Sequence, residues 1–291
     1  MHDNLQLLQL SIHLCHTFVV ELKVTRYTVD ETGVATVWLH RPERRNSWTG
    51  RMHDEYRWIC KQLDDDPAVR VIVLTGSGHT FCIGADPKAL SGYVAAEHYD
   101  PALAADAENP GYGVRPEFDA DMTWQLGMRV PMIAAVNGAC AGIAMALAAF
   151  CDIRFAVAGA KLTTGATKLG LPAEYGLSWM LPRLVGMTHA ADILLSGRVV
   201  LAEEMERMGF FNRVLPAEAF AAHVDEYAHR IAAVSPSSVA TTKRQLWADL
   251  LHNDPAAAVV ESKRLIGIAM KQPDYAEGVA AFLEKRPPRF T

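Results

Sequence analysis

The first part of the chain alternates short apolar runs with polar, glycine-containing turns. The segments "FVVELKVTRYTV" (18–29) and "VATVWLH" (34–40) flank "DETG", a composition typical of two strands joined by a tight turn. The next stretch, "GRMHDEYRWICKQLDDD", places Met52, Tyr56 and Ile59 at helical spacing after a Ser or Thr cap. Because "VRVIVLTGSG" then has the pattern of a buried strand, we predict strand, strand, helix, strand.

The segment "RVPMIAAVNGACAGIAMALAAFCDIRFAV" repeats this order as strand, glycine turn, helix, strand. Gly138 and Gly142 precede a run that is uncharged as far as Cys151. Beyond Met187 the pattern becomes mainly helical, with a cap at Ser235 and a last helix in "YAEGVAAFLEKR". Strands that alternate with helices, followed by helices alone, predict an α/β fold with an α-helical C-terminal part.

These patterns divide the chain into three parts. We predict an N-terminal extension over residues 1–17, a core over 18–215 and a C-terminal helical region over 216–291. The segment from 92 to 121 has little periodicity, and a loop of this length in a compact domain is usually functional. We expect it to shape a binding pocket. Several aromatic and apolar residues could wall such a pocket or be plain core: Trp48, Met52, Tyr112 and Trp124.

Composition excludes several classes of protein. The 291 residues carry a formal net charge of -5, and the isoelectric point is near 6.1, which disfavours nucleic acid and anionic membranes as partners. No run of about 20 uncharged apolar residues predicts a membrane span, and the N-terminus has no secretion signal, so we expect a cytoplasmic protein. The "HLCH" segment is too tight for a four-ligand zinc site, and we expect no metal. Five separated cysteines have the pattern of reduced core residues: Cys15, Cys60, Cys82, Cys140 and Cys151.

Two glycine turns could carry chemistry. The turns "IGAD" and "AGIAM" each place small residues where a strand leads into a helix, and the start of a helix exposes backbone N–H groups without partners. If both turns directed N–H groups at one point, a thioester carbonyl would fit there and its negative charge would be stabilised as an enolate forms. The alternative is that the glycines serve only tight turns and close packing.

Five motifs in order resemble the crotonase superfamily, that is, the enoyl-CoA hydratase/isomerase family. They are "VATVWLHRPERRNSWT", "VRVIVLTGSGHTFCIGADPKAL", "AAVNGACAGIAMALAAFCDIRFA", "KLGLPAEYGLSWMLPRLVG" and "AFLEKRPPRF". The resemblance covers nearly everything from residue 18 to the C-terminus. It implies a ClpP-like spiral of ββα units, a C-terminal region used in assembly as a trimer or a dimer of trimers, and acyl-CoA substrates that need no further cofactor.

The resemblance also implies roles for particular residues. The two oxyanion donors of the family correspond to the backbone N–H groups of Ala85 and Ile143. Glycine is common at the second position, so the side chain of Ile143 has to point away from the site. Asp86 could instead be a helix cap, and the last helix could be an ordinary amphipathic one. Residues similar to those that bind CoA, the last two from a neighbouring subunit, are Arg44, Arg45, Ser47, Ile83, Gly84, Asp86, Gly142, Phe282 and Lys285.

The acidic residues of this chain differ from those of the hydratases that it resembles. The positions that correspond to the two hydratase glutamates are Ala146 and Ala166, and neither can move a proton. Glu174 falls where some isomerases and dehalogenases of the family have an acid, and we predict it as the proton-transfer residue, since a single carboxylate suffices for an allylic shift. Alternatively, Glu174 is a surface residue or pairs with Arg183. The sequence therefore predicts an isomerase-like enzyme or atypical hydratase, with a thioester or carbon-carbon hydrolase and an inactive CoA-binding scaffold as alternatives. The identity of the acyl group stays open.

Overall fold

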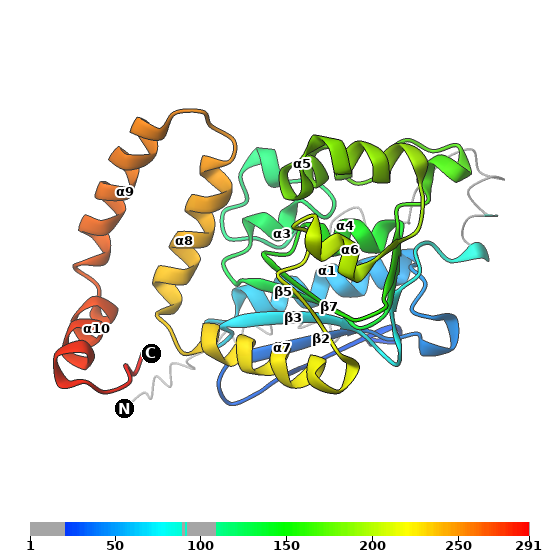
Figure 1. Ribbon diagram of the computed structural model, residues 1–291. Helices are drawn as coiled ribbons and strands as arrows, with labels where there is room; N and C mark the ends of the chain where they lie inside the picture. Colours follow the sequence, from blue (N-terminus) through cyan, green and yellow to red (C-terminus); the bar gives the residue numbers. More distant parts are fainter. Residues whose placement is uncertain (1–20, 89–90, 92–108, 291) are drawn as a thin grey trace, which may run out of the picture.

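The computed structural model describes residues 21–88, 91 and 109–290, and Figure 1 shows their arrangement. The strands are β1 (Thr25–Val29), β2 (Val34–Leu39), β3 (Val71–Gly76), β4 (Thr80–Cys82), β5 (Met132–Val136), β6 (Ala139–Ala141), β7 (Ile153–Val157), β8 (Lys161–Thr163), β9 (Val200–Leu201) and β10 (Arg213–Leu215). The longer helices are α1 (Gly50–Asp65), α3 (Trp124–Gly127), α4 (Ile143–Ala149), α5 (Leu177–Ser196), α6 (Ala202–Arg207), α7 (Ala217–Ala232), α8 (Pro236–Asp249), α9 (Pro255–Ala269) and α10 (Pro273–Glu284). Short 3₁₀ turns are η1 (Pro42–Arg44), η2 (Pro116–Phe118) and η3 (Ala166–Leu169).

Two sheets organise the described part of the core. The larger sheet has the order β1-β2-β3-β5-β7-β10, and the smaller has the order β4-β6-β8-β9. β1 pairs antiparallel with β2, which confirms the predicted hairpin, and Asp30 Oδ1 accepts the backbone N–H groups of Thr32 and Val34 in its turn. The other neighbours in the larger sheet run parallel. The carboxyl ends of β3 and β5 therefore lie at one edge of the sheet, where ligands of parallel sheets usually bind.

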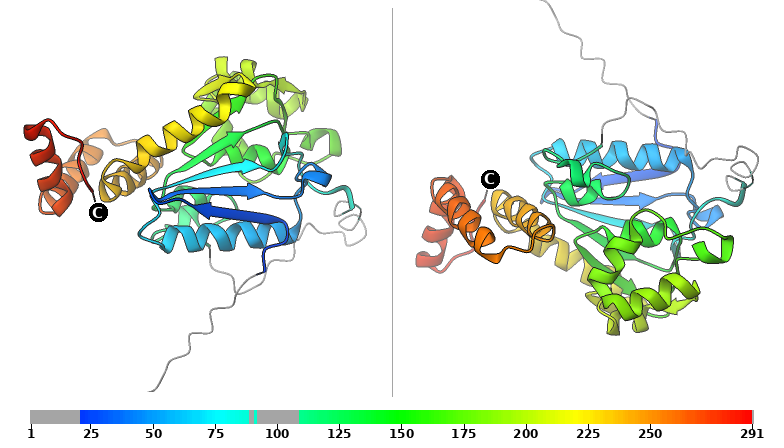
Figure 2. Two further views of the ribbon diagram at one scale, coloured as in Figure 1. Left: turned by 90° about the horizontal axis from the view of Figure 1, so that it is seen from below. Right: turned by 90° about the horizontal axis from the view of Figure 1, so that it is seen from above.

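Alternate residues of the larger sheet face two helical layers. Ile72 and Leu74 belong to the core under α1 and α4, whereas Val71 and Val73 pack with α7 on the opposite face. This follows from the period of two in a strand, and it explains why β3 reads as an unbroken apolar run. Figures 1 and 2 show α7 along one face of the sheet and α1 on the other.

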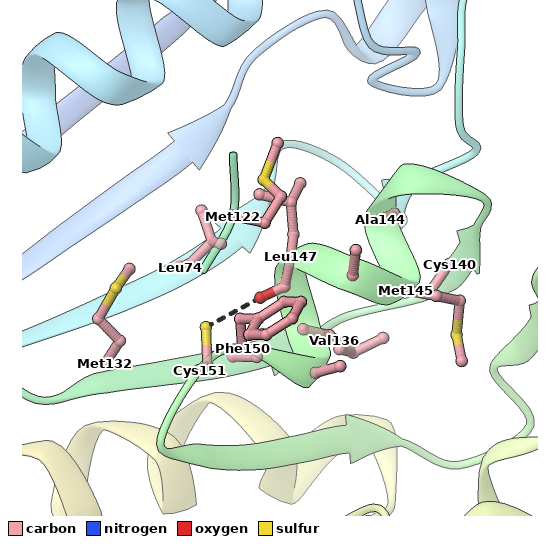
Figure 3. Close-up of a cluster of buried hydrophobic side chains, with 14 of the residues drawn as sticks. Leu74, Met122, Met132, Val136, Cys140, Ala144, Met145, Leu147, Phe150 and Cys151 are labelled. Carbon is pink, nitrogen blue, oxygen red and sulfur yellow. Dashed lines mark hydrogen bonds between the residues drawn. The ribbon is translucent and has the colours of Figure 1, made fainter. Parts of the chain in front are cut away.

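Helix α4 is the most deeply buried element. All seven of its residues are buried, and Figure 3 shows Ala144, Leu147 and the following Phe150 within a cluster of apolar side chains from several elements. The close fit requires small side chains, because protein interiors are packed as densely as organic crystals. The uncharged run that stands out in the sequence is therefore the centre of the core.

Helices α8, α9 and α10 stand to one side of this core (Figure 1). A buried ion pair anchors α8, in which Lys243 Nζ lies 2.8 Å from Asp152 Oδ2 and also donates to the carbonyls of Gln125 and Val130. The predicted cap is confirmed, since Ser235 Oγ accepts the N–H of Ser238. The division at residue 215 stays a prediction, and α7, which it assigns to the C-terminal region, covers the sheet.

Other expectations concern single residue types. The four described cysteines are free and buried, as predicted, and burial raises the pKa of the Cys82 thiol to about 12. No described helix is long and apolar enough to cross a bilayer. Across the same residues no cluster of three or more His, Cys, Asp or Glu side chains could hold a metal ion. Cys15 and the "HLCH" segment lie outside the described residues.

Candidate active site

Two glycine bends meet beyond the carboxyl ends of β3 and β5. The first bend, residues 83–86, follows β4, and the second, residues 141–143, follows β6, which pairs in parallel with β4. A methyl group on Gly84 would lie 3.0 Å from the carbonyl oxygen of Ala141, and one on Gly142 would lie 3.7 Å from the Cα of Gly84. Both glycines have positive φ, +90° and +56°. At Gly84 the backbone of the second bend leaves little room for a side chain, whereas at Gly142 it is the left-handed φ that favours glycine.

The two predicted donors lie in these bends. Within the described part of the chain, neither the N–H of Ala85 nor that of Ile143 donates to an acceptor. Ile143 is the first residue of α4, where an N–H has no partner inside the helix. Its side chain is 2% exposed and packs in the core, as expected for a branched residue that must point away from the site. The bends thus present two free N–H groups close together.

A network of charged and polar side chains supports the first bend. Asp86 Oδ2 accepts hydrogen bonds from Arg41 Nη1 at 3.1 Å and from Ser47 Oγ at 3.0 Å, and Asp86 Oδ1 accepts the N–H of Lys88. Burial opposes ionisation of Asp86, but these hydrogen bonds outweigh it and lower the pKa of the carboxyl. The Asp86 side chain is buried. Its bond to the N–H two residues further on is that of a helix cap, which agrees with the helix-cap alternative.

The segment before α1 runs alongside the first bend. The N–H of Trp48 donates to the carbonyl of Gly84 at 2.8 Å, and the N–H of Asp86 donates to the carbonyl of Trp48 at 2.9 Å. Trp48 and Ala85 thereby form an isolated parallel bridge. Because both bonds use the neighbours of Ala85, the N–H of Ala85 itself points away from Trp48.

Glu174 lies beside the second bend. Its Oε2 is 4.0 Å from the position of a methyl group on Gly142, and no hydrogen bond or ion pair of its carboxylate is found among the residues described. Burial raises the pKa of Glu174 above its usual range. Arg183 instead packs its guanidinium 4.0 Å from the Trp179 ring. The alternatives of a plain surface residue and a partner of Arg183 are not what the structure shows.

The two alanines at the hydratase positions are buried. Ala146 lies inside α4 with no exposed surface, and Ala166 begins η3 with 4% exposure. Neither position offers a polar atom beyond the backbone. Of these three positions, Glu174 alone supplies a carboxylate.

Several non-glycine residues near the bends have a positive φ, a conformation that is strained for them. Of the five described non-glycine residues with positive φ, Arg45 and Asn46 lie just before Trp48, and Tyr175 follows Glu174; the other two are Met122, in the core, and Lys285, after α10. Such conformations cost on the order of 1–3 kcal/mol each and persist where the surrounding structure enforces them. Their clustering is typical of a functional site.

The remaining predicted residues fall into two groups. Arg44 and Arg45 are exposed near the first bend, with buried Ser47 and partly exposed Ile83 beside them. Phe282, which is 83% exposed, and Lys285 lie on and just after α10, away from the bends (Figure 1). They could approach a site only on another copy of the chain, as the resemblance implies.

Sequence reasoning missed Arg41 and Asn46. Asn46 Oδ1 accepts the N–H of Arg41, and its Nδ2 donates to the carbonyls of Ser77 and Thr80, so it joins the segment before α1 to the start of β4. A polar segment next to a proline gives no periodicity that would mark either residue. Only their distant partners reveal their role: Asn46 bonds to residues 31 and 34 positions away, and Arg41 to Asp86, 45 positions away.

Known proteins resemble this chain over nearly its whole length. The family described as Enoyl-CoA hydratase/isomerase matches residues 30–291. A probable enoyl-CoA hydratase of Rhodobacter capsulatus is 35% identical over 272 residues, which are 91% of this chain and 97% of that protein. A 1,2-epoxyphenylacetyl-CoA isomerase of Escherichia coli is 32% identical over 263 residues, 90% of this chain and 96% of that protein.

Solved structures of proteins with the same family description have a similar fold. A probable enoyl-CoA hydratase/isomerase from Mycobacterium abscessus superposes with a TM-score of 0.78 at 36% identity, over 92% of this chain and 99% of that one. An enoyl-CoA hydratase from Bacillus anthracis superposes with a TM-score of 0.79 at 26% identity, over 92% and 99% of the two chains. The expected crotonase fold, with its C-terminal helical region, is confirmed. The chain therefore belongs to the enoyl-CoA hydratase/isomerase family.

Proposed function

We propose that this enzyme moves a proton on the acyl group of a CoA thioester, with Glu174 as its single acid and base. The N–H groups of Ala85 and Ile143 would hold the thioester oxygen. The names of its relatives include both a hydratase and an isomerase, so the family supports acyl-CoA chemistry of either kind. The alanines at 146 and 166 favour the isomerase, because two-carboxylate activation of water has no second carboxylate there.

The chemistry needs no further reactant. Glu174 takes a proton from an acyl carbon, and the electron pair of that C–H bond moves toward the thioester oxygen, where the two N–H groups stabilise the enolate. The same carboxyl returns the proton to a different carbon, which shifts the double bond. A raised pKa suits this role, since a shuttle must be protonated and deprotonated in turn.

One observation carries the proposal: the half-buried carboxylate of Glu174, which has no partner among the described residues, lies beside the bends that hold the two unpaired N–H groups. Replacing Glu174 by Gln keeps the shape and removes the base. We expect at least a hundredfold loss of rate with a 3-enoyl-CoA substrate and a retained fold by circular dichroism. Glu226→Gln, an exposed change in α7 beside Arg230, is the matched control and should leave the rate unchanged.

The same assay separates the alternatives. Release of free CoA from a saturated acyl-CoA would indicate a thioester hydrolase, and hydration of a 2-enoyl-CoA would indicate an atypical hydratase. A CoA-binding scaffold would show thioester binding without turnover, and Glu174→Gln would then change nothing.

We also propose the assembly and the CoA contacts that the family suggests. A homotrimer or a dimer of trimers would bring Phe282 and Lys285 of one subunit to the CoA of another. Within one subunit, CoA would lie along the strip of Arg44, Arg45 and Ser47 and along the first bend. The four free, buried cysteines favour a reducing compartment, the cytoplasm, and the negative charge balance disfavours a nucleic-acid partner.

A further inference from the structure

A buried arginine lies at the carboxyl end of α4. Arg154, on β7, is 6% exposed. Its guanidinium donates to three backbone carbonyls, those of Phe210 at 2.8 Å, Ala149 at 3.3 Å and Cys151 at 2.5 Å. Ala149 is the last residue of α4, and Cys151 comes two positions later. The end of this helix therefore holds a cation within the core.

No acidic side chain pairs with this cation. None of the ion pairs among the described residues includes Arg154, and Asp152, two positions before it, pairs instead with Lys243 Nζ at 2.8 Å. Burial lowers the pKa of Arg154, but a guanidinium stays protonated in proteins, and a buried charge without an opposite charge is costly. The negative pole of α4 offsets this cost, because the carbonyl end of a helix carries about half an elementary charge.

Other carbonyls at this end of α4 also have donors. The carbonyl of Leu147 accepts Gln125 Nε2 at 3.1 Å and Cys151 Sγ at 3.3 Å, the second of which is drawn in Figure 3. The carbonyl of Ala148 accepts the N–H of Cys151 at 3.3 Å. These donors are neutral, whereas Arg154 brings a full positive charge. Hydrogen bonding of the helix end is thus shared among several groups, and cancelling its negative pole falls to Arg154.

The opposite end of α4 carries one of the two proposed oxyanion donors. Ile143 is the first of the seven residues of α4, and a helix of this length extends about 10 Å. All seven residues are buried, and buried charges are screened by salt much less than exposed ones. Over such a distance in a protein interior, one unit charge changes the stability of an anion about fivefold. The cation is therefore close enough to influence an enolate oxygen at Ile143.

We propose that Arg154 is a positioning residue of the oxyanion site that acts through α4. Its charge cancels the negative pole at the carboxyl end of the helix, so the N–H of Ile143 at the other end polarises the thioester carbonyl more strongly. Its hydrogen bonds also hold the helix end in place against β7. This inference rests on the proposed function, because Ile143 has to bind the thioester oxygen.

Infrared spectroscopy tests the effect of the charge. The probe is acetyl-CoA with an isotope label at the carbonyl carbon, and the isotope-edited difference spectrum reports the bound thioester, whose frequency falls as the carbonyl is polarised. Arg154→Gln keeps N–H donors and removes the charge, so the bound carbonyl should show a smaller fall in frequency. We also expect kcat with a 3-enoyl-CoA to drop about fivefold while KM changes little. Arg154→Lys keeps the charge and should keep the wild-type frequency.

Arg129→Gln is the matched control. Arg129 donates in the same way to the carbonyls of Asp64 and Asp66 at the end of α1. Because α1 has 16 residues, this cation lies much further from the start of its helix, and Gly50, the first residue there, is not an oxyanion donor. The variant should lose stability in thermal unfolding but keep the wild-type carbonyl frequency and kcat.

The outcomes are distinct. A wild-type carbonyl frequency in Arg154→Gln would overturn the inference and leave the proposed function intact. If Arg154→Gln does not fold, Arg154→Lys decides, because a weaker polarisation in a variant that keeps the charge would also overturn the inference. A wild type that does not bind acetyl-CoA, or that leaves its carbonyl frequency unchanged, would instead contradict the proposed function.

Discussion

The two bends of the site present the same group, a backbone N–H, but are supported in opposite ways. A charged network of Arg41, Ser47 and Asp86 supports the first bend, whereas buried apolar residues of α4 support the second. Because the donor is the backbone, neither bend needs a particular side chain at the donor itself. That is why isoleucine is compatible with the second position.

The difference also predicts how each bend fails. Charged support depends on protonation and on keeping both partners, since a buried charge without its partner is costly. Apolar support depends on volume and close approach, since a dense core tolerates little change in shape. The following experiments test this contrast in order of expected effect.

The largest effect is expected where the turns that lead into β4 and β6 pack together, at the opposite ends of these strands from the two bends. A methyl group on Gly138 would lie 2.1 Å from the carbonyl oxygen of His79, an approach that only a shift of backbone could relieve. We expect Gly138→Ala to lower the free energy of unfolding by more than about 3 kcal/mol and to abolish activity. Urea denaturation followed by circular dichroism measures this.

Gly267 provides the matched control. It lies within α9, and a methyl group there would meet nothing within 4 Å. Gly267→Ala should therefore stabilise the protein, by about 0.5–1 kcal/mol, because alanine is the better helix former. Equal losses at the two glycines would contradict the close approach of the turns that lead into β4 and β6.

Removing the charged support should have the next largest effect. Asp86→Ala removes the ion-pair partner of Arg41, which keeps its hydrogen bonds to Ser47, and we expect a loss of about 3 kcal/mol, the low end for a buried pair because the Arg41 side chain is 17% exposed. The N–H of Ala85 then loses its fixed direction, so kcat should fall about tenfold while KM changes little. Steady-state kinetics on folded protein measure both.

Asp30→Ala is the control that separates the positioning of the Ala85 N–H from a general loss of stability. Asp30 also accepts several hydrogen bonds in a turn, but it lies at the other end of β2. The variant should lose about 1 kcal/mol and keep the wild-type kcat. Asp86→Asn, which keeps the shape of the side chain, should recover part of the rate. A wild-type kcat in Asp86→Ala would show that the network has no part in positioning the donor.

The smallest effects are expected from pH, and they have opposite signs at two carboxylates. The pKa of Glu174 is raised above 4.5, so the carboxyl stabilises the fold below that pH and loses this contribution as the pH rises through its folded pKa. The pKa of Asp86 is lowered below 3.8, so its contribution is present above that pH and is lost as the pH falls.

A pH profile distinguishes the two carboxylates. Catalysis needs the ionised form of Glu174, so the acid limb of kcat/KM should have its midpoint above 4.5 and should vanish in Glu174→Gln. Asp86→Ala should lower the whole profile without moving that midpoint. A midpoint below 4.5 would indicate that Glu174 is not the base.

Most local structure could be predicted from the sequence. The hairpin at "DETG", the Thr49 cap with its hydrogen bond to the N–H of Met52, and the cap at Ser235 all depend on neighbouring residues. The short β6 was not predicted, because three residues between two glycines give no periodicity. Family membership also followed from the order of the motifs, whereas the role of Glu174, predicted from its place in one of them, stays a prediction.

The amino-acid sequence by itself determined most of the strands and helices, the two bends and the absence of acids at 146 and 166, since each depends on residues close together in the chain; β6, β9 and β10 are too short to leave a pattern. Only the tertiary structure decided which distant groups meet. Arg41 and Asp86, 45 positions apart, become partners, and the Glu174 carboxylate comes to lie against Gly142. These contacts depend on how the two sheets and α4 pack. Packing is a property of the whole core, so it leaves no pattern in any short stretch of the sequence.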